Sequence, residues 1–413
     1  MEQVKITKLV HGGQGMGTMP DGRIVFVWNT LPGETVAVRI IKSKKDYAEG
    51  IAEEIIVASP DRIEPLEPAS YLATSPWQMM NFAAENRHKK DILAEAFQRE
   101  HVLIPEFKFT AGGEQLGYRS KMEYGFWGDD QGISLAHFVR GSHGKNKVEG
   151  SVLARTALND AAKDVMAEIN TFQMRAGDIK SLLLRCDQNG NTVAALFVKR
   201  EDFIRIKKPK SLQGMVVYYS NPKSPASVPT KLLYALGERT LQDKVLDTPI
   251  KYDVLSFFQV NLPIFNVAMQ TIKQWVKAAP LIDMYSGVGA IGIPLKTTRT
   301  LIELDAVNCE MARQNVGNAS IEVVHASGEK ALQYITGKES VIVDPPRAGL
   351  HPNIIARLIE TKPPTIVYLS CNPSTQARDV AHLIGAGYSI KHMEGFNFFP
   401  RTPHIENLII LQL

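Results

Sequence analysis

The chain has 413 residues, of which 44% are hydrophobic and 22% are charged, and its formal net charge at pH 7 is +4. This length and composition predict a globular protein of two or three domains. They exclude a membrane-spanning helix, because no apolar run approaches roughly 20 residues. The first residues lack the order of a signal peptide, so we expect a cytoplasmic protein that binds no membrane. The mild charge means that any affinity for nucleic acid must come from local patches.

Residues 1–58 contain short β-branched runs separated by Gly-rich turns. The runs lie at 4–10, 23–28, 34–41 and 48–57. Several strands at this spacing predict a small β-barrel of the oligonucleotide-binding type. We interpret the glycines of residues 11–17 as turn formers. Positive and negative charges balance in this unit. Two interpretations therefore stay open: a domain that binds RNA and a domain with only a structural role.

Residues 59–250 begin with a linker punctuated by prolines, at 59–68. A helix is predicted at about 86–100, with an apolar face of Ile92, Leu93, Ala96 and Phe97. Residues 117–126 are predicted as a strand.

That strand would place Arg119 and Lys121 on one face, with Tyr118 and Tyr124 interleaved. Basic residues beside aromatics favour contacts with RNA phosphates and bases, although a solvated sheet face is the simpler interpretation. Residues 199–210 hold the densest basic patch of the chain. Such a run is often only a soluble loop.

From about residue 251 onward, apolar strands alternate with helices in the manner of an α/β parallel sheet. The seven candidate strands lie at 281–283, 300–303, 321–324, 341–343, 366–369, 390–394 and 408–410. In a sheet of this kind, ligands bind beyond the carboxyl ends of the strands.

The stretch from Asp283 to Gly289 is predicted as the end of a strand and a tight turn, with a helix following. Glu303 closes the next strand, where a doubly wound sheet places a carboxylate for ribose hydroxyls. The turn lacks a third glycine and a Lys-Ser/Thr pair, and Asp283 would repel a pyrophosphate. A ligand with ribose, adenine and a cationic centre suits this chemistry, and S-adenosylmethionine is such a molecule.

The three cysteines are Cys186, Cys309 and Cys371. They form no even framework and no metal-ligand spacing, which suits a reducing cytosol. Cys186 and Cys309 are expected to be small buried hydrophobes. Cys371 follows an apolar strand directly and precedes the turn Asn372-Pro373, so its thiol should face the ligand crevice. Asp344 also follows a strand and should point into the same crevice.

Several motifs of this sequence resemble the RNA uracil-5-methyltransferase family, whose members methylate uridines in tRNA and 23S rRNA. The motifs lie at residues 283–296, 344–350, 368–379 and 398–406. The resemblance implies a Rossmann-like class I methyltransferase domain at 251–413, a central α+β RNA-binding domain at 59–250 and an OB-like TRAM barrel at 1–58. It also implies that the helix at about 86–100 packs on the catalytic domain.

The resemblance assigns roles residue by residue. Cys371 would be the nucleophile and Glu406 the base. Cofactor contacts would come from Gln259, Tyr285, Gly287, Gly289, Glu303 and Asp344. Contacts with structured RNA would come from Arg119, Lys121, Arg347 and His404. Serines, Ser75 and Ser151, stand where some members have cysteines for an iron–sulfur cluster, so we expect no cluster and no metal. Ala290 and Ser327 replace asparagines that touch the cofactor in some relatives.

The chemistry of uracil explains these groups. A thiolate adding to carbon 6 places negative charge on carbon 5, which can then accept a methyl group. A free thiol has a pKa of about 8.5, so the surroundings of Cys371 should help to deprotonate it. A base must then remove the proton from carbon 5 before the sulfur can leave, and Glu406 is assigned to that step.

Two alternatives stay open. In an amino-group methyltransferase of RNA or DNA, Asp344-Pro-Pro would hold an exocyclic amine and Cys371 would be structural. The chain could also be a non-catalytic RNA-binding protein. The TRAM-like unit favours 23S rRNA over tRNA by resemblance, and we expect a monomer.

Overall fold

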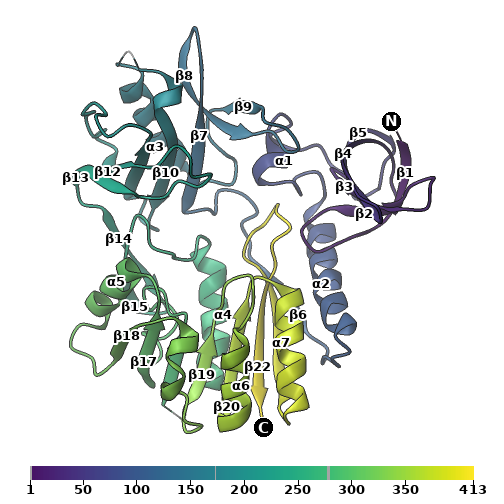
Figure 1. Ribbon diagram of the computed structural model, residues 1–413, viewed down its shortest axis with the longest axis vertical. Helices are drawn as coiled ribbons and strands as arrows, with labels where there is room; N and C mark the ends of the chain where they lie inside the picture. The colour runs from purple at the N-terminus through teal and green to yellow at the C-terminus, as the bar shows by residue number, and fades with distance from the viewer. Residues whose placement is uncertain (1, 173, 277–279) are drawn as a thin grey trace.

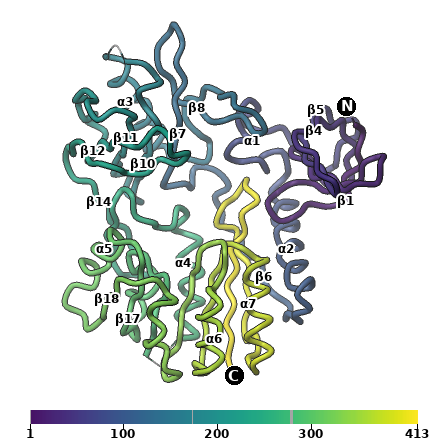
Figure 2. Tube along the Cα trace, in the orientation of Figure 1, coloured from purple at the N-terminus to yellow at the C-terminus, as the bar shows by residue number. Residues whose placement is uncertain are grey.

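The computed structural model describes residues 2–172, 174–276 and 280–413. Three units are visible in Figure 1: an N-terminal barrel, a middle unit built on a sheet, and a C-terminal sheet with helices. The trace in Figure 2 shows the barrel as a separate lobe on one side. Within the described ranges, no helix is both long and apolar enough to cross a membrane.

Five strands close the N-terminal barrel in the order β1-β2-β3-β5-β4. They are β1 (Glu2–Leu9), β2 (Gly15–Thr18), β3 (Ile24–Trp28), β4 (Thr35–Ser43) and β5 (Tyr47–Val57). The Gly-rich turn expected at residues 11–17 is present only at residues 11–13, whereas Gly15 and Gly17 belong to strand β2. A Cβ atom at Gly15 would clash with Thr30, and one at Gly17 would clash with Val4. These glycines therefore let β2 approach its neighbours closely.

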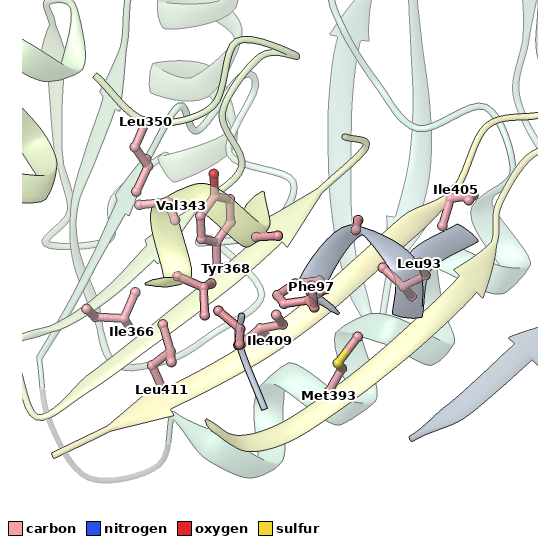
Figure 3. Packing of buried hydrophobic residues seen from close by; sticks show 14 of the residues in the cluster. Leu93, Phe97, Val343, Leu350, Ile366, Tyr368, Met393, Ile405, Ile409 and Leu411 are labelled. Carbon is pink, nitrogen blue, oxygen red and sulfur yellow. The ribbon is translucent and has the colours of Figure 1, made fainter. Parts of the chain in front are cut away.

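The linker leads through α1 (Tyr71–Thr74) into α2 (Phe82–Arg99). Helix α2 begins four residues before the expected start, because the side chain of Asn81 caps it by accepting from the N–H of Ala84. The apolar face of α2 is buried as expected. Figure 3 shows Leu93 and Phe97 of this helix among Met393, Ile405 and Ile409 of the C-terminal unit. An early segment of the chain thus packs on the C-terminal sheet.

The middle unit is a seven-stranded sheet of order β13-β12-β11-β10-β7-β8-β9. Helix α3 (Thr156–Ile169) packs on one face and shares its apolar core. A hairpin of β14 and β15 leads out of the unit. The remaining bounds are β7 (Lys121–Asp129), β8 (Gly132–Phe138), β9 (Lys145–Val148), η1 (Ala176–Asp178), β10 (Ile179–Cys186), β11 (Thr192–Val198), β12 (Leu212–Tyr219), β13 (Lys231–Gly237), β14 (Thr240–Val245) and β15 (Thr248–Asp253).

The C-terminal unit is an eight-stranded sheet of order β18-β17-β16-β19-β20-β22-β21-β6. All seven expected strands are present, as β16 (Leu281–Met284), β17 (Thr298–Glu303), β18 (Glu322–His325), β19 (Ser340–Val343), β20 (Thr365–Ser370), β21 (Ser389–Asn397) and β22 (Glu406–Gln412). The eighth, β6 (Lys108–Ala111), pairs in parallel with β21. The helical segments are α4 (Leu262–Trp275), α5 (Ala306–Val316), η2 (Gly328–Lys330), η3 (Leu332–Tyr334), α6 (Pro352–Thr361) and α7 (Pro373–Gly385).

The helix expected directly after Gly289 is absent from this described segment, which is a series of turns up to β17. Gly287 and Gly289 have φ values of 56° and 85°, which lie in the left-handed region. Pro294 has no N–H to continue a helix. The prediction of a tight turn was therefore right, and the prediction of a helix after it was wrong.

Candidate active site

A cavity of ≈ 420 Å³ lies at the carboxyl ends of β16, β17, β19 and β20. It brings together most of the residues singled out in the sequence. Those lining it are Gln259, Tyr285, Gly287, Glu303, Asp344, Arg347, Cys371 and Glu406. Gly289, His404, Arg119 and Lys121 are not in its lining. A second cavity of ≈ 940 Å³ shares Tyr285, Glu303 and Pro346 with the first.

Cys371 lies in the turn between β20 and α7. The turn is fixed on both sides: Ser370 Oγ accepts from the N–H of Asn372 at 3.1 Å, and Asn372 Nδ2 donates to the carbonyl of Arg347 at 2.7 Å. Cys186 and Cys309 are buried, whereas Cys371 is only partly so. Of the three thiols, Cys371 alone lines the cavity.

Two carboxyl groups face this thiol from neighbouring strands. Glu406 begins β22 and is buried, and both burial and the carboxylate of Asp344 raise its pKa well above the usual value. Burial raises the pKa of Asp344 to about 7. Two buried carboxyls in one cavity disfavour simultaneous ionisation, so this pair can hold a proton near neutral pH.

The surroundings of Cys371 contradict the expectation that they promote its ionisation in the free protein. Burial raises the pKa of this thiol to about 11, and Glu406 and Asp344 add to the effect. Arg347 acts in the opposite direction and lowers the pKa of the thiol. Carboxylates repel a thiolate, so the ligand-free site favours the neutral thiol.

His404 lies beside the cavity and contacts Arg347. Nη2 of Arg347 is 3.3 Å from Nδ1 of His404. Burial and the charge of Arg347 lower the pKa of His404 to about 4, so this ring is neutral at pH 7. Arginine can only donate, so Nδ1 accepts and the proton of the ring is on Nε2.

Several buried polar atoms around the turn after β16 have no hydrogen-bond partner among the described residues. Glu303 accepts from the N–H of Gly287 at 2.8 Å and from that of Asp305 at 2.6 Å. Within the described ranges, four buried side-chain oxygens in this region have no hydrogen-bond partner: Asp283 Oδ1, Ser286 Oγ, Asn308 Oδ1 and Ser327 Oγ. Buried polar atoms are normally satisfied, so the set fits a polar ligand such as an adenosine derivative.

The sequence interpretation missed several residues of the cavity. Phe257, Phe258 and Phe265 flank Gln259 and supply apolar walls, and Asn308 reaches the cavity from α5. The Phe-Phe pair directly before Gln259 was the available signal for the walls. Asn308 gave none, because its position on a helix looked like that of any polar residue.

Arg119 and Lys121 do not share a strand face, because β7 begins only at Lys121 and Arg119 makes an isolated bridge to Ala154. Arg119 lies close to the hydroxyl of Tyr118, which donates to the carbonyl of Pro400 at 2.9 Å. Burial and the charge of Arg185 lower the pKa of Lys121 to about 8. Tyr118 and Tyr124 are buried, so neither presents a ring for stacking.

Groups of three or more His, Cys, Asp or Glu side chains that could hold a metal ion do not occur in the part of the chain that the structure describes. The prediction that no iron–sulfur cluster is bound rests on the cysteine spacing of the sequence.

Comparisons with known proteins agree with this architecture. Residues 331–413 match the family model described as tRNA (Uracil-5-)-methyltransferase, and residues 2–52 match the TRAM domain. An uncharacterized RNA methyltransferase of Thermotoga maritima is 26% identical, over 100% of this chain and 99% of its own. One of Caldanaerobacter subterraneus is 28% identical, over 99% and 98%.

Among solved structures, the tRNA (uracil-54, C5)-methyltransferase of Pyrococcus abyssi, crystallised with S-adenosyl-L-homocysteine, has a TM-score of 0.81 with this chain. The two are 24% identical, and the match covers 100% of both chains. The fold class expected from the sequence, a Rossmann-like methyltransferase domain with an N-terminal barrel, is therefore confirmed.

Proposed function

We propose that this chain, which matches the tRNA (Uracil-5-)-methyltransferase model at residues 331–413 and the TRAM domain at residues 2–52, methylates carbon 5 of a uridine in structured RNA, with S-adenosylmethionine as methyl donor. One observation carries the proposal. A thiol, two carboxyl groups and all but one of the expected cofactor residues line a single cavity. An acceptor base and a methyl donor could therefore meet beside Cys371.

The cavity residues suit the cofactor. Glu303 lines both cavities and would hold the ribose hydroxyls between them. Gln259, Tyr285, Gly287 and Asp344 would surround the rest of the molecule. Gly289 would act through the shape of the turn, since it does not line the cavity. When bound, the cofactor supplies an electrophilic methyl group.

Cys371 and Glu406 would divide the work on the uracil ring. The thiol of Cys371 loses its proton to solvent, and the resulting thiolate forms a bond to carbon 6, so that the electron pair of the carbon 5–carbon 6 double bond becomes available at carbon 5 for methylation. Glu406 then removes the proton from carbon 5. The electrons of that carbon–hydrogen bond restore the double bond, and the sulfur leaves with the pair from its bond to carbon 6.

The two earlier alternatives are weaker. A non-catalytic RNA-binding protein would not need a partly exposed thiol beside two buried carboxyls. An amino-group methyltransferase would need Asp344 but no nucleophile, and the covalent intermediate distinguishes the two reactions.

The identity of the RNA needs its own experiment. The barrel alone gives no reason to favour 23S rRNA, because the Pyrococcus tRNA enzyme matches this chain from end to end. Mass mapping of methylated uridines in tRNA and 23S rRNA from a deletion strain would identify the target. Loss of methylation from one of the two RNAs, restored by the wild-type gene, assigns it.

A trapping experiment tests the proposed reaction. RNA containing 5-fluorouridine should become covalently attached to the protein in the presence of S-adenosylmethionine, because the fluorine cannot be removed as a proton. Cys371→Ala should abolish the adduct and methyl transfer, whereas Cys186→Ala, at a buried thiol of the middle sheet, should leave both intact. Methyl transfer by Cys371→Ala at the wild-type rate would overturn the proposal.

A further inference from the structure

Helix α2 contains an ion pair that lies outside both cavities and is completely shielded from solvent. Glu85 and Lys89 are each 0% exposed, one helical turn apart, and their charged atoms are 2.9 Å from each other. Burying two charges costs free energy that mutual attraction does not always offset. The pair therefore calls for an explanation beyond the packing of α2.

Lys89 forms hydrogen bonds at the connection between β21 and β22, which is residues 398–405 together with the last residue of β21, Asn397. Besides Glu85, its ammonium donates to Asn397 Oδ1 at 2.7 Å and to the carbonyl of Phe399 at 3.1 Å. An ammonium has three N–H donors, so each has a partner. The same lysine is 5.7 Å from the ring centre of Trp77, within range of a cation–π contact.

Glu85, the other member of the ion pair, also forms hydrogen bonds with this connection. Its carboxylate accepts from Asn397 Nδ2 at 2.8 Å and from the N–H of Arg401 at 3.0 Å. Arg401 has a φ of 65°, a left-handed conformation that is uncommon for a residue other than glycine. The bond to Glu85 therefore holds a backbone position that the chain would not adopt readily by itself.

Three further donors complete this set. Asn261 donates to the carbonyl of Phe398 at 3.0 Å, Tyr118 to that of Pro400 at 2.9 Å, and the N–H of Trp77 to that of Arg401 at 3.1 Å. Together with Lys89, they give every carbonyl from Phe398 to Arg401 a donor from a distant part of the chain. Residues 398–401 are thus fixed from several sides.

This connection leads directly to the site. Asn397 is the last residue of β21, and its neighbour Phe396 pairs with Glu406 at the start of β22. His404 lies within the connection. Figure 1 shows it as the yellow loop that rises from the sheet towards the middle unit, next to α2. A shift at Asn397 or Arg401 would therefore move the proposed base.

We infer that Glu85 and Lys89 are positioning residues, which fix the β21–β22 connection so that Glu406 can reach the proton on carbon 5 of the bound uracil. The inference rests on the proposed function. Neither residue lines the cavity that contains Cys371, so their loss should leave the addition and methylation steps intact. It should slow proton removal, because a displacement of even about 1 Å can greatly reduce the rate of a positioned step.

The double variant Glu85→Gln/Lys89→Met tests this inference, since it removes both charges and preserves the side-chain volumes. We expect trapping of 5-fluorouridine RNA within about twofold of wild type. Turnover on ordinary uridine RNA should fall about tenfold or more, and a covalent adduct with that RNA should accumulate. A purely structural role would reduce trapping and turnover in parallel with the folded fraction, and that result would overturn the inference.

A matched control lies on the same helix. Glu95 pairs with Lys8 of the barrel and with Arg99, so its ion pairs are made with other parts of the chain than the β21–β22 connection. Glu95→Gln should leave the balance between trapping and turnover unchanged. If the double variant does not fold, Tyr118→Phe removes a single donor, to the carbonyl of Pro400, and should cause adduct accumulation in the same direction to a smaller extent.

The outcomes separate the two proposals. If wild-type protein fails to trap 5-fluorouridine RNA, the proposed function is wrong. If wild-type protein traps this RNA, and the double variant or Tyr118→Phe releases ordinary uridine RNA at the wild-type rate, only the positioning role is wrong.

Discussion

Arg347 contacts His404: its guanidinium is 3.3 Å from Nδ1 of this histidine, which lies in the loop before Glu406. Its carbonyl accepts from Asn372 Nδ2 at 2.7 Å and from Thr375 Oγ1 at 3.2 Å, which ties it to the turn after Cys371. Among the described residues that line the cavity of Cys371, it is the one permanent cation. It is thus the group best placed to favour a thiolate there.

Arg347→Gln should slow the attack of Cys371. The pKa of this thiol is raised to about 11, and Arg347 opposes the increase. Without the guanidinium the pKa rises further, so less thiolate is present at any given pH. We expect adduct formation with 5-fluorouridine RNA to fall about tenfold at pH 7.5, and its pH profile to move to higher pH. Arg347→Lys keeps the charge and should be less impaired. Identical profiles for wild type and Arg347→Gln would contradict this role.

Asp344→Asn should change how stability depends on pH. Burial raises the pKa of Asp344 from 3.8 to about 7, so between these values the folded protein holds a proton that the unfolded chain has released. This group therefore stabilises the fold at low pH, and its contribution is lost as the pH rises through 7.

Asparagine cannot ionise and so avoids this loss. The Tm of Asp344→Asn minus the Tm of wild type should therefore be about 2 °C larger at pH 8 than at pH 5. Asp130→Asn, at an exposed carboxyl between β7 and β8, should give the same difference at both pH values. Equal shifts for Asp344→Asn at the two pH values would show that its carboxyl is not held neutral by burial.

The strands and the position of the site followed from local sequence. Short, mostly apolar runs gave seven of the eight strands of the C-terminal sheet, and the carboxyl-end rule placed Cys371 and Asp344 in one crevice. These features depend on a few neighbouring residues and on a general property of parallel sheets. The turn at Gly287 and Gly289 was predictable for the same reason.

Features that depend on distant partners could not be predicted. Strand β6 has only four residues, and its partner β21 lies more than 270 residues later. Glu85 and Lys89 looked like ordinary polar residues of a helix, because their partners at 397–401 are about 310 residues away. The raised pKa of Cys371 was missed because it depends on burial and on carboxyls from two other strands.

Gln259→Ala and Glu303→Gln should weaken cofactor binding. Glu303 lines both cavities and Gln259 lines the smaller, so each loses contacts made before the chemical step. We expect the Kd for S-adenosylmethionine, measured by calorimetry, to rise about 10- to 100-fold. The rate at saturating cofactor should change less than the Kd. Wild-type affinity in either variant would remove that residue from the cofactor site.

The division of labour between Cys371 and Glu406 is the central claim. Glu406→Gln keeps the size of the side chain and removes its ability to accept a proton. Cys371 should still add to carbon 6 and the methyl group should still be transferred, but release should stop before the proton on carbon 5 is removed.

The decisive measurement is denaturing electrophoresis of Glu406→Gln with ordinary uridine RNA and S-adenosylmethionine, followed by mass analysis of the attached nucleotide. The account predicts a stable protein–RNA adduct that carries the methyl group and disappears in Cys371→Ala/Glu406→Gln. Normal turnover by Glu406→Gln, or loss of activity without any adduct, would contradict it.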